Sequence, residues 1–371
     1  MIYLDYSATT PVNNEILETF VKISNNFIGN PNSLHKLGID SKNLIDEATN
    51  QLASILKVKQ VEVIYTSGSS ESNNLALKGI ASKYFRMGKH IITTELEHSS
   101  IYGPLSYLQK KDFEISFVKL DENGLVDLDD LKNLLRKDTI LVSINSVNSE
   151  TGVLQNIDKI SKVIKNNSSA FFHVDMTQSV GKIEISLENV DLASFSAHKF
   201  YGLKGIGCLI KKEKVNLEPL IHGGKSTTIY RSGTPAPALI VSISKALRLS
   251  LIDIKIKNNY ILELNNYLKD KLNQYDNVKI NSTNYSIPHI LNFSVLNVKP
   301  ETLQHSLEEF DIYISTQSAC ATGNMSKAVY AITKDEKRAL SSIRISLSYL
   351  TTKEEIKKFL EAFDICYKRL T

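Results

Sequence analysis

A lysine at the end of an apolar segment is the first residue of this sequence that could do chemistry. Residues 195–199 read Phe-Ser-Ala-His-Lys, and the glycine-containing stretch 201–205 follows them. A lysine held at the end of a strand, here Lys199, can form a Schiff base with an aldehyde cofactor. A solvated lysine at a strand end would leave the same pattern, so Lys199 alone keeps both interpretations open.

A carboxylate occupies the corresponding place one strand earlier. The segment His173-Val174-Asp175 ends an apolar run. Because ligands of open α/β sheets bind beyond the carboxyl ends of the strands, we expect Asp175 and Lys199 to face one crevice. A carboxylate beside a pyridine nitrogen keeps that nitrogen protonated, so the ring withdraws electrons from a substrate. An aspartate that only caps a turn is common, but it would not explain the matching position of Lys199.

Small hydroxyl residues lie between a predicted strand and a predicted helix. Residues 66–72 read Thr-Ser-Gly-Ser-Ser-Glu-Ser. The free N–H groups at such a helix start can hold a phosphate, although a segment like this is often an ordinary helix cap. Combined with Asp175 and Lys199, the segment predicts a site for a phosphorylated cofactor.

A histidine follows another predicted strand. His98 lies in the segment 94–100, just beyond an apolar run. An imidazole in this place could stack on a flat ring and move protons. A lone histidine is more often structural, so His98 gains weight only beside Asp175 and Lys199.

The elements that must position these residues alternate between strands and helices. Short apolar runs at 61–66, 90–94, 115–118, 140–144, 170–175, 191–196 and 207–210 predict strands, and helical spacing marks 73–85 and 157–165. This order predicts an α/β fold with a mostly parallel sheet. Beyond residue 250 a helix (251–275), a strand (290–295), a helix after Pro300 and a closing helix from Thr352 predict a smaller α+β domain. We expect a large domain at 12–250, and a small domain made of 1–11 and 251–371.

Composition excludes several classes of protein. The chain has 371 residues, 42% of them hydrophobic, and its 44 basic and 40 acidic residues give a net charge of only +4. Because the charges are evenly spread, we expect no direct binding of nucleic acid. The N-terminus lacks the features of a signal peptide, and no run approaches the ~20 apolar residues of a membrane span, which predicts a cytoplasmic enzyme without a membrane partner.

The sequence resembles a known family from Tyr3 to about Leu350. It is similar to the cysteine desulfurases of the NifS/IscS type, in the class-V aminotransferase family of the fold-type I pyridoxal 5'-phosphate (PLP) enzymes. The resemblance rests on residues 3–11, 29–31, 66–68, 97–98, 173–175, 196–199, 231–234, 318–320 and 342–344. It implies a homodimer that converts L-cysteine to L-alanine and keeps the sulfur as a persulfide on an enzyme cysteine.

The resemblance also implies a role for each matching residue. Lys199 would carry PLP as a Schiff base, with His98 as the stacking acid/base, Asp175 on the pyridine nitrogen and Gln178 on the ring hydroxyl. Arg344 would clamp the substrate carboxylate near Asn30. Ser149 stands where the family usually has asparagine, and its hydroxyl would contact the cofactor ring over a shorter reach. The remaining cofactor ligands would be Ser69, Ser70, Ser196, His198 and, from the second subunit, Thr234.

Cys320 occupies the place of the family's persulfide-forming nucleophile, in the polar segment 315–324. The thiol must attack the substrate sulfur as a thiolate and then pass that sulfur to an acceptor, and His98 or Arg344 would help to ionise it. Cys208 and Cys366 lie in an apolar strand pattern and in the last helix, so we expect them to be buried and structural.

The sequence is also compatible with other functions. A selenocysteine lyase or a cysteine-sulfinate-type lyase would use the same Lys199 and Asp175, and an aminotransferase is a more distant alternative. The chain could also be a sulfur-relay docking protein with little activity of its own. The sulfur acceptor could be a tRNA-thiolation enzyme, an iron–sulfur scaffold or another carrier.

Overall fold

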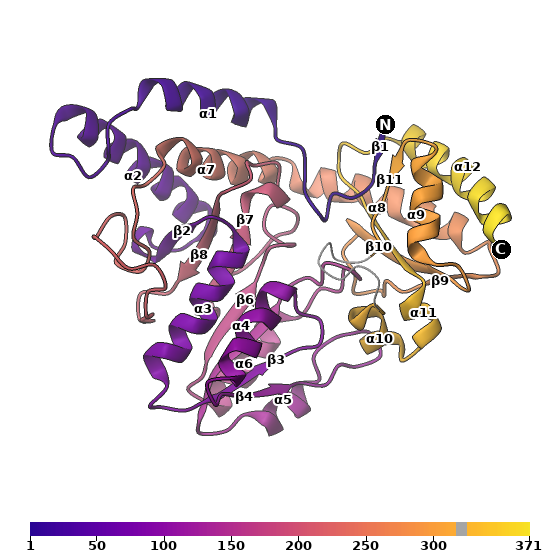
Figure 1. The fold of residues 1–371 in the computed structure, drawn as a ribbon, viewed down its shortest axis with the longest axis horizontal. Coiled ribbons are helices and arrows are strands. Elements are labelled where there is room, and N and C mark those ends of the chain that lie inside the picture. The colour runs from indigo at the N-terminus through magenta and orange to yellow at the C-terminus, as the bar shows by residue number, and fades with distance from the viewer. Residues whose placement is uncertain (317–324) are drawn as a thin grey trace.

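The protein is described here by a computed structural model that covers residues 1–316 and 325–371. Figure 1 shows two lobes that meet along one side. In the described chain the larger lobe holds a seven-stranded sheet with the order β2-β8-β7-β6-β5-β3-β4. Its strands are β2 (Val63–Thr66), β3 (His90–Thr93), β4 (Glu114–Phe117), β5 (Thr139–Asn145), β6 (Phe171–Asp175), β7 (Leu192–Ser196) and β8 (Gly207–Lys211).

Strand direction follows the prediction with one exception. The strands β4, β3, β5, β6 and β7 pair in parallel, whereas β8 is antiparallel to both β7 and β2. The sheet is therefore mostly parallel, and the predicted α/β class is confirmed. Because parallel strands end at the same edge, the residues that follow β3, β5, β6 and β7 lie close together.

Both faces of the large sheet are covered by helices, which explains why its strands are continuously apolar. Adjacent strand residues such as Leu141 and Val142 pack into different hydrophobic clusters on opposite faces. On one face lie α2 (Lys36–Leu56), α5 (Leu128–Leu134), α6 (Ile157–Asn167) and α7 (Pro237–Leu251), with α1 (Asn14–Asn26) packed on α7; on the other lie α3 (Ser69–Tyr84) and α4 (Ser99–Gln109).

The smaller lobe has its own core around a three-stranded antiparallel sheet, β12-β10-β9. Its strands are β9 (Val278–Ile280), β10 (Ile290–Val295) and β12 (Ser342–Ser346), and its helices are α8 (Ile254–Leu272), α9 (Pro300–Glu308), α10 (Lys327–Thr333), α11 (Glu336–Leu340) and α12 (Lys353–Leu370). The N-terminal strand β1 (Ile2–Tyr3) pairs in parallel with β11 (Ile312–Tyr313), so the first residues join the C-terminal part of the chain. Leu4 is fully buried in this second core.

No helix of the described chain is long and apolar enough to span a membrane.

Two leucines of α8 provide a matched test of the smaller core. Leu264 is 1% exposed and Leu262 is 45% exposed. Leu264→Ala is expected to lower the free energy of unfolding of this lobe by about 2–5 kcal/mol, because it removes buried methyl groups and leaves a cavity. Leu262→Ala should cost less than about 1 kcal/mol. Urea unfolding of both variants checks this, and equal losses would contradict the packing.

Candidate active site

The cavity that contains most of the predicted site residues lies where β5, β6 and β7 end. Asn145, the last residue of β5, pairs in register with Asp175, the last residue of β6. Lys199 follows β7 in the short 3₁₀ helix η2 (Ala197–Lys199). A cavity of about 230 Å³ opens between these ends and Arg344 of β12. It is lined by Ser7, Ala8, Ser69, Ser70, Leu96, His98, Asn145, Val147, Ser149, Asp175, Thr177, Gln178, His198, Lys199 and Arg344.

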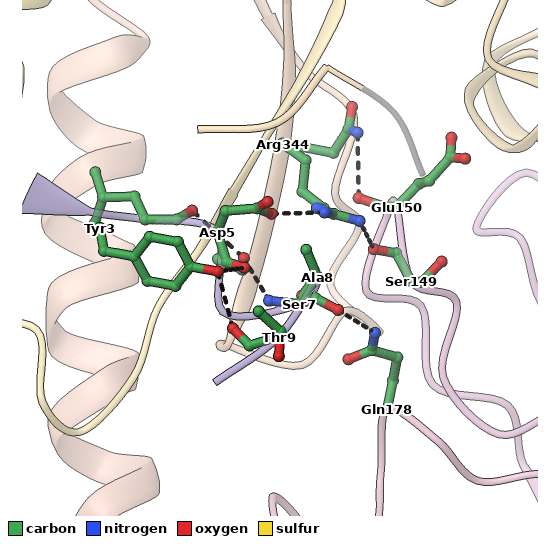
Figure 2. A network of polar contacts seen from close by, with 12 residues as sticks. Tyr3, Asp5, Ser7, Ala8, Thr9, Ser149, Glu150, Gln178 and Arg344 are labelled. Carbon is green, nitrogen blue, oxygen red and sulfur yellow. Dashed lines mark hydrogen bonds and ion pairs between the residues drawn. The ribbon is translucent and has the colours of Figure 1, made fainter. Parts of the chain in front are cut away.

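The amine of Lys199 is held by the N-terminal segment. Lys199 Nζ donates to the carbonyl oxygens of Ser7 (2.6 Å) and Ala8 (2.8 Å). Figure 2 shows how this segment curls, with the Tyr3 hydroxyl 2.9 Å from the carbonyl oxygens of both Asp5 and Thr9. The backbone that follows β1 therefore fixes the position of the lysine end.

The carboxylate of Asp175 is held in one orientation by three donors. Its Oδ2 accepts a hydrogen bond from Asn73 Nδ2 (2.8 Å). Its Oδ1 accepts from the backbone N–H of Thr177 (3.0 Å) and from the Thr177 hydroxyl. Asp175 is only 6% exposed, and it lines the cavity. Such a carboxylate is suited to pair with a protonated ring nitrogen.

His98 caps the N-terminus of α4 and lines the same cavity. Its Nδ1 accepts the backbone N–H of Ser100 (3.2 Å). Burial lowers the pKa of His98 below its ordinary value of 6.5; the Asp175 charge raises this pKa by a smaller amount, and the Lys199 charge lowers it further. The ring is therefore neutral at neutral pH, and because Nδ1 is an acceptor, its proton resides on Nε2.

The start of α3 forms the wall next to Ser69 and Ser70. The backbone N–H of Ser69 donates to Ser196 Oγ (2.6 Å), which ties this turn to the end of β7. A Cβ on Gly207 would lie 2.7 Å from the Cα of Gly68, so only glycine allows β8 to approach this turn. The 16-residue helix α3 directs the positive end of its dipole here, which favours an anion such as a phosphate.

His198 lies beside this wall. Burial and the adjacent Lys199 charge lower the pKa of His198 to about 4, so the ring is neutral at pH 7.

Arg344 is 2% exposed and is anchored by two partners. Nη2 donates to Asp5 Oδ1 (2.7 Å), and Nη1 donates to the carbonyl oxygen of Ser149 (2.9 Å), as Figure 2 shows. Its Nε has no hydrogen-bond partner in the described chain. A guanidinium fixed in this way can present further N–H groups to a carboxylate without reorganising.

The cavity contains most of the predicted site residues. Ser69, Ser70, His98, Ser149, Asp175, Gln178, His198, Lys199 and Arg344 line it, and Ser196 bonds to its wall. Asn30 and Thr234 are exposed and lie outside it. Cys320 lies outside the described residues. Cys208 and Cys366 are buried, which confirms the prediction for these two.

Several residues that line the cavity or bond to its lining were not predicted from sequence. Asn145 ends an apolar strand as Asp175 does, so the strand-end rule could have identified it. Asn73 lies one turn after Ser70 on α3, and this spacing was a usable signal. Residues 3–11 contributed to the resemblance, but the contacts of Asp5 and of the Ser7 carbonyl gave no signal, because their partners lie far away in the sequence.

The comparisons with known proteins agree with this geometry. The sequence profile of the family described as aminotransferase class-V matches residues 2–359, and the chain belongs to that family. Among curated relatives, cysteine desulfurase IscS of Dictyoglomus turgidum is 37% identical over 375 residues, covering 100% of this chain and 95% of the relative. Cysteine desulfurase IscS of Buchnera aphidicola subsp. Baizongia pistaciae is 41% identical over 382 residues, covering 100% and 93%.

Solved structures show the same likeness. A NifS-like protein superposes with a TM-score of 0.94 at 34% identity over 100% of both chains. SspA in complex with cysteine superposes with a TM-score of 0.83 at 29% identity, covering 95% of this chain and 100% of that one. The resemblance seen in the sequence is therefore confirmed.

Glu97, directly before His98, ties the 94–98 turn to the end of β5. Its Oε1 accepts from the Thr94 hydroxyl (2.7 Å), from Asn145 N (2.9 Å) and from Asn145 Nδ2 (3.1 Å). Burial raises its pKa from 4.5 to about 8. The carboxyl group is therefore largely protonated at pH 7, although its pKa in the unfolded chain is near 4.5.

This raised pKa predicts a pH-dependent stability. Between about pH 5 and pH 8 the unfolded chain has released a proton that folded Glu97 keeps, so the stability that this group contributes falls as the pH rises. Glu97→Gln keeps the accepting oxygen and does not titrate. Relative to wild type, it is expected to be more stable at pH 8 than at pH 5 by a few kcal/mol. Urea unfolding of the cofactor-free proteins measures this; an equal difference at both pH values would show that folded Glu97 is ionised.

Proposed function

We propose that this protein is a PLP-dependent cysteine desulfurase, which converts L-cysteine to L-alanine and transfers the sulfur to an enzyme cysteine as a persulfide. One observation carries the proposal: a single cavity brings together the amine of Lys199, the carboxylate of Asp175, the imidazole of His98 and the guanidinium of Arg344. The curated relatives that are named cysteine desulfurase cover the whole chain.

The groups that line the cavity fit PLP. The amine of Lys199 would bind its aldehyde carbon, and Asp175 would pair with its ring nitrogen. Gln178 and Ser149 would contact the ring hydroxyl. The start of α3, with Ser69, Ser70, Ser196 and His198, would hold the phosphate. When bound, PLP supplies an electron sink that weakens the bonds at the substrate α-carbon.

The residues of the chain then bind the substrate and move its protons. Arg344 binds the carboxylate of cysteine, and Asp5 and the Ser149 carbonyl hold its guanidinium in place. Asn30 would assist from the mouth of the site. Lys199 Nζ accepts the α-proton, and His98 Nε2 carries a proton that can be donated to the substrate.

Cys320 is proposed as the sulfur acceptor within the enzyme. Its thiolate attacks the substrate Sγ; an S–S bond forms as the Cβ–Sγ bond breaks, and the electron pair stays on the carbon part, which is protonated to give alanine. The residues that flank its segment support this assignment. Ser315 pairs with Arg344 through two backbone hydrogen bonds, and Ser326 Oγ donates to Glu150 Oε2 (2.6 Å). Both ends therefore lie beside the proposed substrate clamp.

A second copy of the chain is the proposed structural partner. Exposed apolar side chains gather on α1, α2 and the loop between them: Leu17, Val21, Ile28, Leu34, Leu37 and Ile39. Burying such a patch favours association. Thr234, which lies outside its own cavity, would complete the phosphate site of the partner subunit. The physiological acceptor of the persulfide sulfur would be a further protein, a tRNA-thiolation enzyme or an iron–sulfur scaffold.

The first test is the stoichiometry of the reaction. With L-cysteine, PLP and a reductant, the wild-type protein is expected to release alanine and sulfide in equal amounts. Lys199→Ala should lower both by at least about 100-fold, because it removes the nucleophile and proton acceptor. Lys204→Ala, at an exposed lysine of the adjacent loop, is the matched control and should keep most of the activity.

The outcomes separate the candidate reactions. Unchanged product release by Lys199→Ala would contradict the proposal. If the wild-type protein binds PLP but makes neither product, the cofactor assignment stands and the substrate is wrong; selenocysteine and keto-acid pairs are then assayed.

The second test concerns Cys320. Cys320→Ala is expected to keep the absorption of bound PLP and to lose persulfide formation, measured by labelling with an alkylating probe and by sulfide release. Cys366→Ala is the control, because that thiol is buried in α12. Full sulfide release by Cys320→Ala would overturn the assignment, and normal turnover of selenocysteine by this variant would favour a selenocysteine lyase.

A further inference from the structure

A lysine that the reaction above does not use lies behind the active site. Lys182 is only 8% exposed, in the turn that follows β6. Its Nζ donates to Oε1 of Gln178, a residue that lines the cavity. Among the described residues Lys182 forms no ion pair with a carboxylate, and residues 317–324 include no Asp or Glu. Burying an amine without a counter-charge costs free energy, so a lysine in this place calls for a functional explanation.

The Gln178 amide has one acceptable orientation because of this contact. Its Oε1 faces the Lys182 amine, which can donate, and its Nε2 donates to the carbonyl oxygen of Ser7 (2.9 Å). A flipped amide would place its NH₂ group against the Lys182 donors and its oxygen against the Ser7 carbonyl. Both hydrogen bonds would be lost, so Lys182 and Ser7 together fix the amide.

The same contacts connect Lys182 to Lys199. The Ser7 carbonyl oxygen that accepts from Gln178 also accepts from Lys199 Nζ (2.6 Å). A chain of three hydrogen bonds therefore runs from one amine through Gln178 and the Ser7 carbonyl to the other. In Figure 2, Gln178 points to the Ser7 carbonyl from the side opposite Arg344.

We infer that Lys182 is a positioning residue of the active site, which orients the Gln178 amide and, through Gln178 and the Ser7 carbonyl, the amine of Lys199. This inference rests on the proposed function, because it assigns Gln178 and Lys199 to the cofactor.

The surroundings of Lys182 all lower the pKa of its amine. Burial, followed by the charges of Lys199 and Arg344, lowers the pKa of Lys182 well below its usual value of 10.5. Lys182 in turn contributes to the lowered pKa values of His198 on η2 and of His289, which is buried just before β10. The electrostatic coupling thus reaches residues of both lobes.

The test compares Lys182→Met with Lys211→Met. Methionine keeps an unbranched stem in both places and removes the amine. Lys211 is also buried, at 3% exposure, but it stands at the far end of β8, where its Nζ donates to the Val215 carbonyl oxygen (2.6 Å). Each protein is loaded with PLP, and its absorption is followed between about pH 6 and pH 10.

Lys182→Met is expected to raise the pH midpoint of the absorption change by about one unit. Loss of the Lys182 donor releases the Gln178 amide, which would then no longer donate to the ring hydroxyl, and this favours the protonated form of the group that Lys199 makes with the cofactor. Lys211→Met should leave the midpoint unchanged. Lys182→Arg, which keeps a charged donor, should restore a midpoint close to that of wild type.

Three outcomes decide the inference. An unchanged midpoint in folded, PLP-loaded Lys182→Met would overturn it, and so would an equal shift in Lys211→Met. Should Lys182→Met fail to accumulate, Lys182→Leu, which also removes the donor, replaces it in the same titration with the same expectation. A wild-type protein that binds no PLP would instead contradict the proposed function, so the two failures are distinguishable.

Discussion

The backbone carbonyl of Ser7 is the contact on which the site depends, because it accepts from both Lys199 and Gln178. The segment that carries it is anchored at each end in a different lobe. Leu4 is buried in the smaller core, and its carbonyl oxygen accepts from Ser346 N, whereas Thr10 N donates to the carbonyl oxygen of His198. Any shift between the lobes would therefore move the acceptor of the Lys199 amine.

The same segment explains how a buried arginine is accommodated. Placing a guanidinium at 2% exposure is unfavourable unless its charge is compensated. Asp5 supplies the opposite charge two residues before Ser7, and β12 supplies the arginine. The ion pair thus joins the N-terminal segment to the smaller lobe at the edge of the cavity. The position of the Arg344 guanidinium therefore depends on the position of the N-terminal segment.

The sequence was informative where function follows from position on a strand. Asp175 and Lys199 could be predicted to share one cavity because each follows a β-branched or apolar run, and parallel strands end at one edge. The contacts made by Ser7 could not, since its partners Gln178 and Lys199 are 171 and 192 residues away and a backbone carbonyl carries no residue signal. The antiparallel direction of β8 was also missed, because the apolar pattern of a doubly covered strand is the same in either direction. Lys182 gave no signal in the sequence, because lysine is rarely buried.

The arrangement separates two tasks that the proposed reaction combines. Bond weakening at the substrate α-carbon requires groups that do not move, and Lys199, Asp175 and Arg344 are each fixed by at least two hydrogen bonds. Sulfur transfer requires a thiol that visits the substrate and then an external acceptor. Ser315 and Ser326, the described residues on either side of the proposed nucleophile Cys320, are tied to Arg344 and Glu150, so the chain leaves and re-enters the described structure beside the proposed substrate clamp. Under the proposed function, this division would let one cavity keep its geometry while the sulfur leaves it.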